Sequence, residues 1–154
     1  MQFLDEIQLP HPFTQIAHNW AEIEQISGIF TTPFYIKTSY GTASTGVWRI
    51  ERQESLAELK KTLDQQRLLD GQTEFLIQAA APGDFEQSHA IFDRGRLLAL
   101  HCTRRLMECA QGGAAVKIGV NRPAVWQHFE KIGQYLAWHG SLSIDYFWDE
   151  QAGQ

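Results

Sequence analysis

A lysine beside a glycine-rich loop is the first feature of this chain that could do chemistry. Residues 34–50 read FYIKTSYGTASTGVWRI, so Lys37 ends an apolar run and a loop of small and hydroxyl residues follows it. Such a loop can bring its backbone N–H groups close to a phosphate because glycine has no Cβ, and the ammonium adds a positive charge. We therefore expect Lys37 to point inward at a strand end, under a loop that closes over a bound group. The alternative is an ordinary flexible hairpin whose lysine extends into solvent.

The best-known glycine-rich phosphate motifs do not fit this loop. Gly41 to Gly46 matches the first half of a P-loop, but Val47-Trp48 stands where that motif needs lysine followed by serine or threonine. The GxGxxG fingerprint of dinucleotide-binding folds is also absent. The loop lies between two strand-like runs, which would suit a hairpin lid over a triphosphate and equally suits an ordinary hairpin.

Further polar residues suit phosphoryl transfer. Arg104 and Arg105 could neutralise a phosphoryl group during its transfer. Asp145 follows an apolar strand and offers the carboxylate oxygen that Mg²⁺ prefers. The alternatives are solvated charges at a strand end for the arginines and a plain polar residue for Asp145.

Composition and sequence patterns argue against several classes of protein. The chain has 154 residues and a formal net charge of -5, and it has no block of Lys and Arg of the kind that nucleic-acid binders use. No apolar run reaches the roughly 18 residues of a membrane span, and residues 1–12 do not have the pattern of a signal peptide. Cys102 and Cys109 fit no CxxC motif, so we expect reduced thiols in a cytoplasmic protein.

The pattern of elements predicts an α+β fold. Strands gather in hairpins instead of alternating strictly with helices, which is typical of α+β proteins. Residues 1–18 read as irregular. We expect helices from Asn19, from a capping box at Ser55 and Glu58 to about Arg67, and from Pro123 to Gly140. The expected strands are 34–37, 46–51, 74–78, 87–93, 96–102, 114–120 and 142–148.

Four motifs in this order resemble the ATP-grasp superfamily. They are PFYIKTSYGTASTGVWRI, EFLIQAAAPGD, TRRLMECAQGGAAVKIGV and GSLSIDYFWDEQAG. The chain looks most like the branch that contains carbamoyl-phosphate synthase large subunits and biotin carboxylases, with D-alanine–D-alanine ligase more distant. The resemblance runs from about Leu9 to the last residue. It implies an ATP-grasp fold with a lead-in at 1–8, a lid subdomain at 9–75, a larger subdomain at 76–154, and ATP between the subdomains.

The resemblance also implies roles for individual residues. Lys37 would contact the α-phosphate region, Gln78 would meet the exocyclic amine of adenine, and Asp145 would be the first Mg²⁺ ligand. Arg104 and Arg105 match the basic pair of the substrate and phosphate region, where Lys117 is a weaker candidate. Glu86 matches the acid that holds the ribose hydroxyls. The other implied nucleotide contacts are Gly41, Thr42, Ala43, Ser44 and Gly46 in the phosphate loop, and Ala79 and Ala81 beside adenine.

The sequence departs from the family pattern at both ends. We find no match to the separate domain that normally precedes Leu9, to a second phosphate-binding lysine, or to a strand with the pattern acid-x-Asn-Pro-Arg that supplies further metal ligands. The chain is therefore expected to be the core of an ATP-grasp domain, truncated at both ends and inactive alone. A missing strand would leave a sheet edge free to pair with a second copy or with a complementing chain.

The resemblance implies an ATP-dependent ligase. It would convert a small-molecule carboxylate to an acyl phosphate, which an amine, ammonia or another nucleophile then attacks. Two alternatives stay open from the residues: a non-catalytic nucleotide-binding or interaction module built on an ATP-grasp remnant, and an α+β scaffold that binds no nucleotide.

Overall fold

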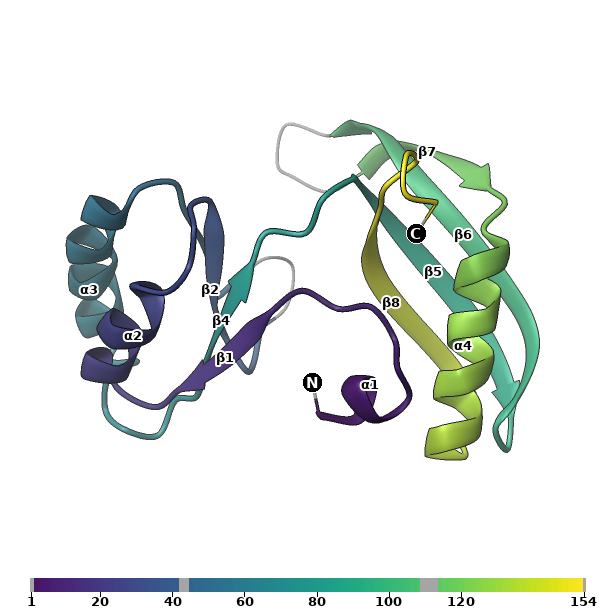
Figure 1. Ribbon diagram of the computed structural model, residues 1–154, viewed down its shortest axis with the longest axis horizontal. Coiled ribbons are helices and arrows are strands. Elements are labelled where there is room, and N and C mark those ends of the chain that lie inside the picture. Colours follow the sequence, from purple (N-terminus) through teal and green to yellow (C-terminus); the bar gives the residue numbers. More distant parts are fainter. Residues whose placement is uncertain (1, 42–44, 109–113, 154) are drawn as a thin grey trace. The chain divides into compact units, whose positions relative to one another are not determined.

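The structure is a computed structural model that describes residues 2–41, 45–108 and 114–153. The chain divides into two compact units. We call His11–Ala81 the 11–81 unit, and Pro82–Gln154 together with Met1–Pro10 the 82–154 unit. Each unit contains a four-stranded antiparallel sheet, and both units are drawn in Figure 1.

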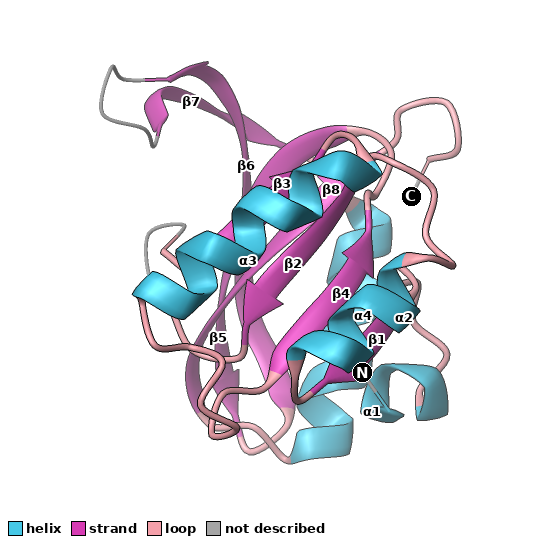
Figure 2. Cartoon of the chain, turned by 90° about the vertical axis from the view of Figure 1, so that its left-hand side faces the viewer, coloured by secondary structure: helices cyan, strands magenta, loops and turns pink. Residues whose placement is uncertain are grey.

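The 11–81 unit packs helices on one face of its sheet. The strand order is β1-β4-β2-β3. Figure 2 shows the helices of this unit beside its strands. The core consists of alternate strand residues, such as Phe34 and Ile36, against helix residues such as Ile23 and Leu63. This period of two sends Tyr35 and the other intervening side chains to the opposite face. The elements are β1 Thr14–Ala17, α2 Trp20–Ser27, β2 Phe34–Thr38, β3 Val47–Ile50, the 3₁₀ turn Gln53–Ser55, α3 Leu56–Gln65 and β4 Phe75–Ala79.

The 82–154 unit has the strand order β7-β6-β5-β8, with α4 on one face. Phe92 and Cys102 of the sheet pack against Val125 and Phe129 of α4, and they form the core of this unit. Strand residues between these positions point to the opposite face. The elements are α1 Gln2–Glu6, β5 Asp84–Asp93, β6 Arg96–Glu108, β7 Ala114–Val120, α4 Pro123–Leu136 and β8 Gly140–Trp148.

The expected α+β class is confirmed, and the local differences have physical causes. Residues 1–18, which were expected to be irregular, contain α1 and β1. Strand β1 forms because it pairs with β4, which lies far along the sequence. The helix that begins at Pro123 stops at Ala137, which adopts a left-handed conformation with φ 47°, and Gly140 instead begins β8. Strands β5 and β6 are longer than expected because β5 pairs with β8 from Asp84 onward and β6 pairs with β7 as far as Glu108.

The two units differ in their bounds from the subdomains expected at 9–75 and 76–154. The division lies between Ala81 and Pro82, because β4 pairs with both β1 and β2 and so belongs to the 11–81 unit. The expected lead-in, 1–8, belongs to the 82–154 unit, where the ring of Phe3 stacks on Tyr135 of α4 with centroids 6.2 Å apart.

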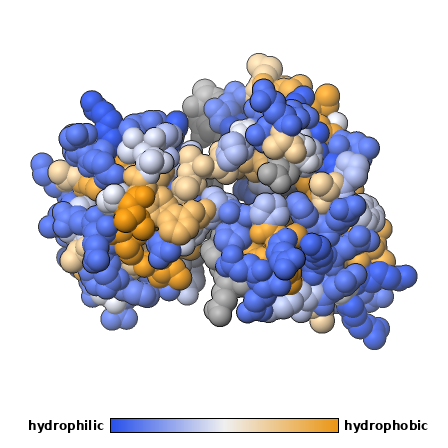
Figure 3. Space-filling model, in the orientation of Figure 1, coloured by the Kyte–Doolittle hydropathy of each residue, from blue (hydrophilic) through white to orange (hydrophobic). Residues whose placement is uncertain are grey.

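The surface is mostly hydrophilic in the view of Figure 3, with a patch of apolar residues on the 11–81 unit. Exposed apolar side chains of this unit include Phe13, Ile16 and Ile29. Among the residues that the structure describes, no helix has both the length and the apolar character that crossing a membrane requires.

Candidate functional site

Lys37 lies on the face of the 11–81 sheet opposite the helices. Its neighbours Phe34 and Ile36 are fully buried in the core, so the alternation of the strand turns Lys37 to the other side. The Nζ of Lys37 donates to Oε1 of Gln78 at 2.6 Å, and Nε2 of Gln78 donates to Oγ1 of Thr14 at 3.0 Å. The Nζ also lies 5.7 Å from the centre of the Tyr35 ring. We call these four residues the Lys37 cluster.

The ammonium of Lys37 is partly withdrawn from water. Burial lowers the pKa of Lys37 below its ordinary value, because the charged form loses hydration. Its Nζ donates to the neutral amide of Gln78. An anion placed beside Lys37 would therefore interact with a positive charge that water hydrates poorly.

The loop after Lys37 closes a β-hairpin, as expected from the sequence. Lys37 pairs with Val47 across β2 and β3, and the backbone N–H of Thr38 donates to the carbonyl oxygen of Gly46 at 2.9 Å. Gly46 has φ +75°, and a Cβ at this position would collide with Oγ1 of Thr38. Glycine therefore suits this position, because of its positive φ and of the space that the Thr38 side chain occupies. Gly41 is exposed, and the expected loop contacts Thr42, Ala43 and Ser44 lie outside the described residues.

The residues expected beside adenine end the 11–81 unit. Gln78 and Ala79 are the last residues of β4, and Ala81 closes the unit two residues later. The side-chain amide of Gln78 already bonds Lys37 and Thr14, and the backbone N–H of Ala79 donates to Phe13 at 2.9 Å. The structure thus links Gln78 directly to Lys37, a contact that the sequence did not predict.

A second polar group lies on the 82–154 sheet, on the face opposite α4. Nε2 of Gln87 donates to Oδ1 of Asp145 at 2.8 Å, and Nζ of Lys117 donates to Oε1 of Gln87. Arg105 shares this face, with its guanidinium 5.2 Å from the centre of the Phe85 ring and an ion pair to Glu108. We call Gln87, Lys117, Asp145 and Arg105 the Gln87 cluster.

Arg104 and Arg105 do not lie on one face of the sheet. They are consecutive in β6, so their side chains point to opposite sides of the sheet. Arg104 lies on the same side of the sheet as Glu86, its cross-strand neighbour. Its Nη1 lies 3.6 Å from Oε1 of Glu150 and 3.9 Å from Oδ2 of Asp84. Only Arg105 lies on the face of Asp145 and Lys117.

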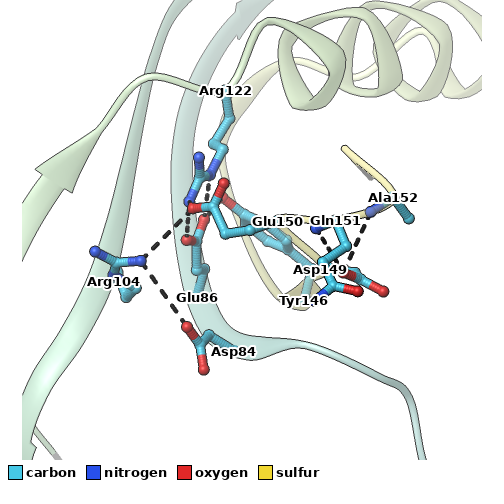
Figure 4. Close-up of polar contacts among 9 residues, drawn as sticks. All are labelled: Asp84, Glu86, Arg104, Arg122, Tyr146, Asp149, Glu150, Gln151 and Ala152. Atoms are coloured by element: carbon cyan, nitrogen blue, oxygen red, sulfur yellow. Dashed lines mark hydrogen bonds and ion pairs between the residues drawn. The ribbon is translucent and has the colours of Figure 1, made fainter.

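Glu86 is fully buried, and its carboxylate is held inside the unit (Figure 4). Arg122 donates from Nε to Oε2 at 3.0 Å and from Nη2 to Oε1 at 2.6 Å, and the hydroxyl of Tyr146 donates to Oε2 at 2.8 Å. No part of this carboxylate is exposed to meet a ribose. The expected ribose contact at Glu86 is therefore wrong, because both oxygens serve an internal ion pair.

Arg122 is the centre of this network and was missed in the sequence. It also bonds Glu150 at 2.7 Å, and its guanidinium lies 4.4 Å from the centre of the Trp148 ring. The hydrogen bonds to Glu86 raise the pKa of Arg122 above its ordinary value, so the charge is permanent. The sequence did show that Arg122 directly precedes Pro123, and so that it stands at the start of α4.

Asp145 suits a metal ion by type but has few companions. Among the described residues, no group of three or more His, Cys, Asp or Glu side chains could hold a metal ion. A cation at Asp145 would therefore take most of its ligands from water and from a bound phosphate, which is the arrangement that Mg²⁺ commonly adopts. The cationic Lys117 and Arg105 on the same face fit a polyphosphate.

Comparison with known proteins gives a match at the level of structure alone. No protein-family profile matches the chain, and no curated protein matches it. Phosphoribosylamine–glycine ligase from Thermotoga maritima superposes with a TM-score of 0.75 at 18% identity, over 97% of this chain and 43% of the ligase. The biotin carboxylase domain of 2-oxoglutarate carboxylase from Hydrogenobacter thermophilus, solved with MgADP, ADP and bicarbonate, gives 0.73 at 11% identity, over 97% of this chain and 36% of that one.

A third similar structure is the RimK domain protein ATP-grasp from Sphaerobacter thermophilus. Its TM-score is 0.63 at 13% identity, and the match covers 97% of this chain and 52% of that protein. The chain thus spans between about a third and a half of the length of these three proteins. At such identities the likeness shows the fold.

Proposed function

Since the chain has the ATP-grasp fold, we propose that it binds ATP and belongs to an ATP-dependent ligase that joins a carboxylate to an amine or ammonia. The observation that carries the proposal is the Lys37 cluster, in which a partly desolvated lysine stands at the root of a glycine-containing hairpin. The similar structures support it, because they include an amine–glycine ligase and a domain solved with MgADP.

In this proposal the 11–81 unit holds the nucleotide. Lys37 contacts the phosphates, and Gly41 and Gly46 belong to the loop over the phosphates. Gln78, Ala79 and Ala81 contact adenine. Because Gln78 accepts a hydrogen bond from Lys37, its amide would also keep the ammonium directed toward the ligand.

The 82–154 unit supplies the charges for phosphoryl transfer. Asp145 would hold Mg²⁺, which neutralises negative charge on the transferred group, and Arg105 and Lys117 would contact the same phosphate. The carboxylate of a small-molecule substrate would attack the γ-phosphorus and release ADP, and the amine would then displace phosphate from the acyl phosphate. Glu86 contacts no ligand in this proposal, because it is fully buried with both oxygens bonded to Arg122. Arg104 contacts none, because it lies on the opposite face of the sheet from Asp145.

Titration calorimetry with the Mg²⁺ complex of AMPPNP tests this function. The wild-type chain should bind, and Lys37→Ala should weaken binding about 10- to 100-fold, since a hydrogen bond to a charged group contributes about 1.5–3 kcal/mol. Lys61→Ala, an exposed lysine of α3, is the matched control and should bind like the wild type.

Circular dichroism must show that each variant is folded. A folded wild-type chain that does not bind the nucleotide complex would contradict the proposal. Equal affinity of the wild type and Lys37→Ala would show that the hairpin lysine is not the phosphate contact.

A further inference from the structure

We propose that Thr14 is a positioning residue, which fixes the side-chain amide of Gln78 so that its oxygen stays turned toward Lys37. The inference rests on the proposed nucleotide function. It adds a residue to which neither the sequence motifs nor the implied family roles assign a part, and it concerns the 11–81 unit alone.

Side chains from three neighbouring strands form a chain of hydrogen bonds. Thr14 of β1 lies directly across from Gln78 of β4, and β4 also pairs with β2, which carries Lys37. Nζ of Lys37 donates to Oε1 of Gln78 at 2.6 Å, and Nε2 of Gln78 donates to Oγ1 of Thr14 at 3.0 Å. Oγ1 of Thr14 donates in turn to the carbonyl oxygen of Pro12 at 2.9 Å. The ammonium is thereby connected to the backbone that leads into β1.

The hydroxyl of Thr14 decides which way round the amide lies. The carbonyl oxygen of Pro12 can only accept, so the single hydroxyl proton of Thr14 is committed to it. The hydroxyl oxygen can then only accept from Gln78, which puts the NH₂ group on the side of Thr14 and the amide oxygen on the side of Lys37. An amide turned over would set its NH₂ group against the ammonium, donor against donor, and its oxygen against a hydroxyl whose proton already bonds Pro12.

A fixed amide oxygen matters for the lysine. Thr14, Gln78 and Lys37 are all half-buried, so water competes weakly for their polar groups. The ammonium of Lys37 sits on a flexible stem, and an acceptor in a fixed place limits the positions that it can adopt. A group that is held in place before binding loses less freedom when a ligand arrives. Thr14 thus acts through Gln78 on the lysine that would contact phosphate.

The alternative is a purely structural hydroxyl, which serves only to bond Pro12 at the start of β1. Two substitutions separate these roles. Thr14→Val keeps the branched shape of the side chain and removes the hydroxyl, whereas Thr14→Ser keeps the hydroxyl. Thr31→Val, at an exposed threonine outside the strands, is the matched control.

The first arm of the test uses the nucleotide-free protein. Nitrogen-15 relaxation measures the motion of the Gln78 side-chain NH₂ group, whose resonances are assigned by their loss in Gln78→Met. The motion should be restricted in the wild type, in Thr14→Ser and in Thr31→Val, and it should increase in Thr14→Val. An NH₂ group that is equally mobile in the wild type and in Thr14→Val would overturn the proposal.

The second arm measures the affinity for the Mg²⁺ complex of AMPPNP by calorimetry. Thr14→Val should weaken binding about 3- to 10-fold, since a typical hydrogen bond makes a net contribution of that size. Thr14→Ser should recover most of the affinity, and Thr31→Val should bind like the wild type. In a Lys37→Ala background Thr14→Val should cause no further loss, because Thr14 acts only through the lysine, whereas a structural effect would add to the loss.

The outcomes separate the positioning role from the nucleotide function. Unchanged affinity in Thr14→Val, or an equal further loss in the Lys37→Ala background, would overturn the positioning role and leave the nucleotide function intact. A folded wild type that does not bind the nucleotide complex would overturn both.

Discussion

Glu86 shows how a buried carboxylate is stabilised by its partners. Its side chain is 0% exposed, and it accepts two hydrogen bonds from Arg122 and one from Tyr146. A buried ion pair of this kind costs desolvation energy, and only good geometry and further hydrogen bonds offset that cost. Burial is the largest cause of the raised pKa of the Tyr146 hydroxyl, which therefore stays protonated and can donate a hydrogen bond. At this scale, Glu86 anchors the sheet to the start of α4.

Removing one member of the buried pair should destabilise the 82–154 unit strongly. Arg122→Met should cost about 3–5 kcal/mol of its unfolding free energy, because the Glu86 charge would remain buried without its cation. The double variant Arg122→Met with Glu86→Leu should recover most of the loss. Native-state hydrogen exchange of β5 amides measures both effects. A double variant that is as unstable as the single one would contradict this account.

At the scale of elements, the two helices of the 11–81 unit begin differently. Asn19 caps α2: its Oδ1 accepts from the N–H of Glu22 at 3.0 Å, and the Glu22 carboxylate accepts in return from the N–H of His18 at 2.8 Å. The pattern of Ser55 and Glu58 predicted a capping box for α3, but Ser55 makes no side-chain cap bond. Ser55 has helical dihedrals, because the 3₁₀ turn Gln53–Ser55 leads directly into α3.

Asn19→Ala and Ser55→Ala form a matched pair of cap variants. Asn19→Ala should destabilise the 11–81 unit by about 1 kcal/mol, because the N–H of Glu22 loses its acceptor, and Asn19→Ser should restore most of this stability. Ser55→Ala should change it by at most a few tenths of a kcal/mol, within the range usual for surface substitutions. Urea unfolding with hydrogen-exchange readout distinguishes them. Equal losses at the two positions would refute the assignment of the cap to Asn19.

At the scale of the whole molecule, each unit has its own hydrophobic core. Phe34 belongs to the core of the 11–81 unit, and Phe129 belongs to the core of the 82–154 unit. Both side chains are at most 2% exposed. A unit with its own core can open by a local transition of its own, with its own free energy.

Truncating either phenylalanine should therefore affect one unit. Phe34→Ala should lower exchange protection in β2 and β4, and Phe129→Ala should lower it in β5 and β6. The expected cost is about 3–5 kcal/mol in each case, through lost burial and a cavity. Hydrogen exchange followed by mass spectrometry reads both units in one sample. If either variant reduced protection equally in both units, the cores would not be energetically independent.

The sequence by itself determined the local features and the fold. It predicted the α+β class, the strand that ends near Lys37, the hairpin at its loop and the helix that begins at Pro123, and the structure confirms all four. The expected ATP-grasp fold is confirmed as well. These features depend on residue patterns over short segments and on the order of the motifs, and both can be read directly in the amino-acid sequence.

Only the tertiary structure decided which side chains meet. The period of two in β6 separates Arg104 from Arg105 whatever the fold, but packing against α4 decides which of them shares a face with Asp145. Glu86 is buried because Arg122, 36 residues later, reaches it. Gln87 stands between Lys117 and Asp145 because strands distant in sequence are neighbours in one sheet. Such contacts depend on long-range register, which local sequence patterns do not specify.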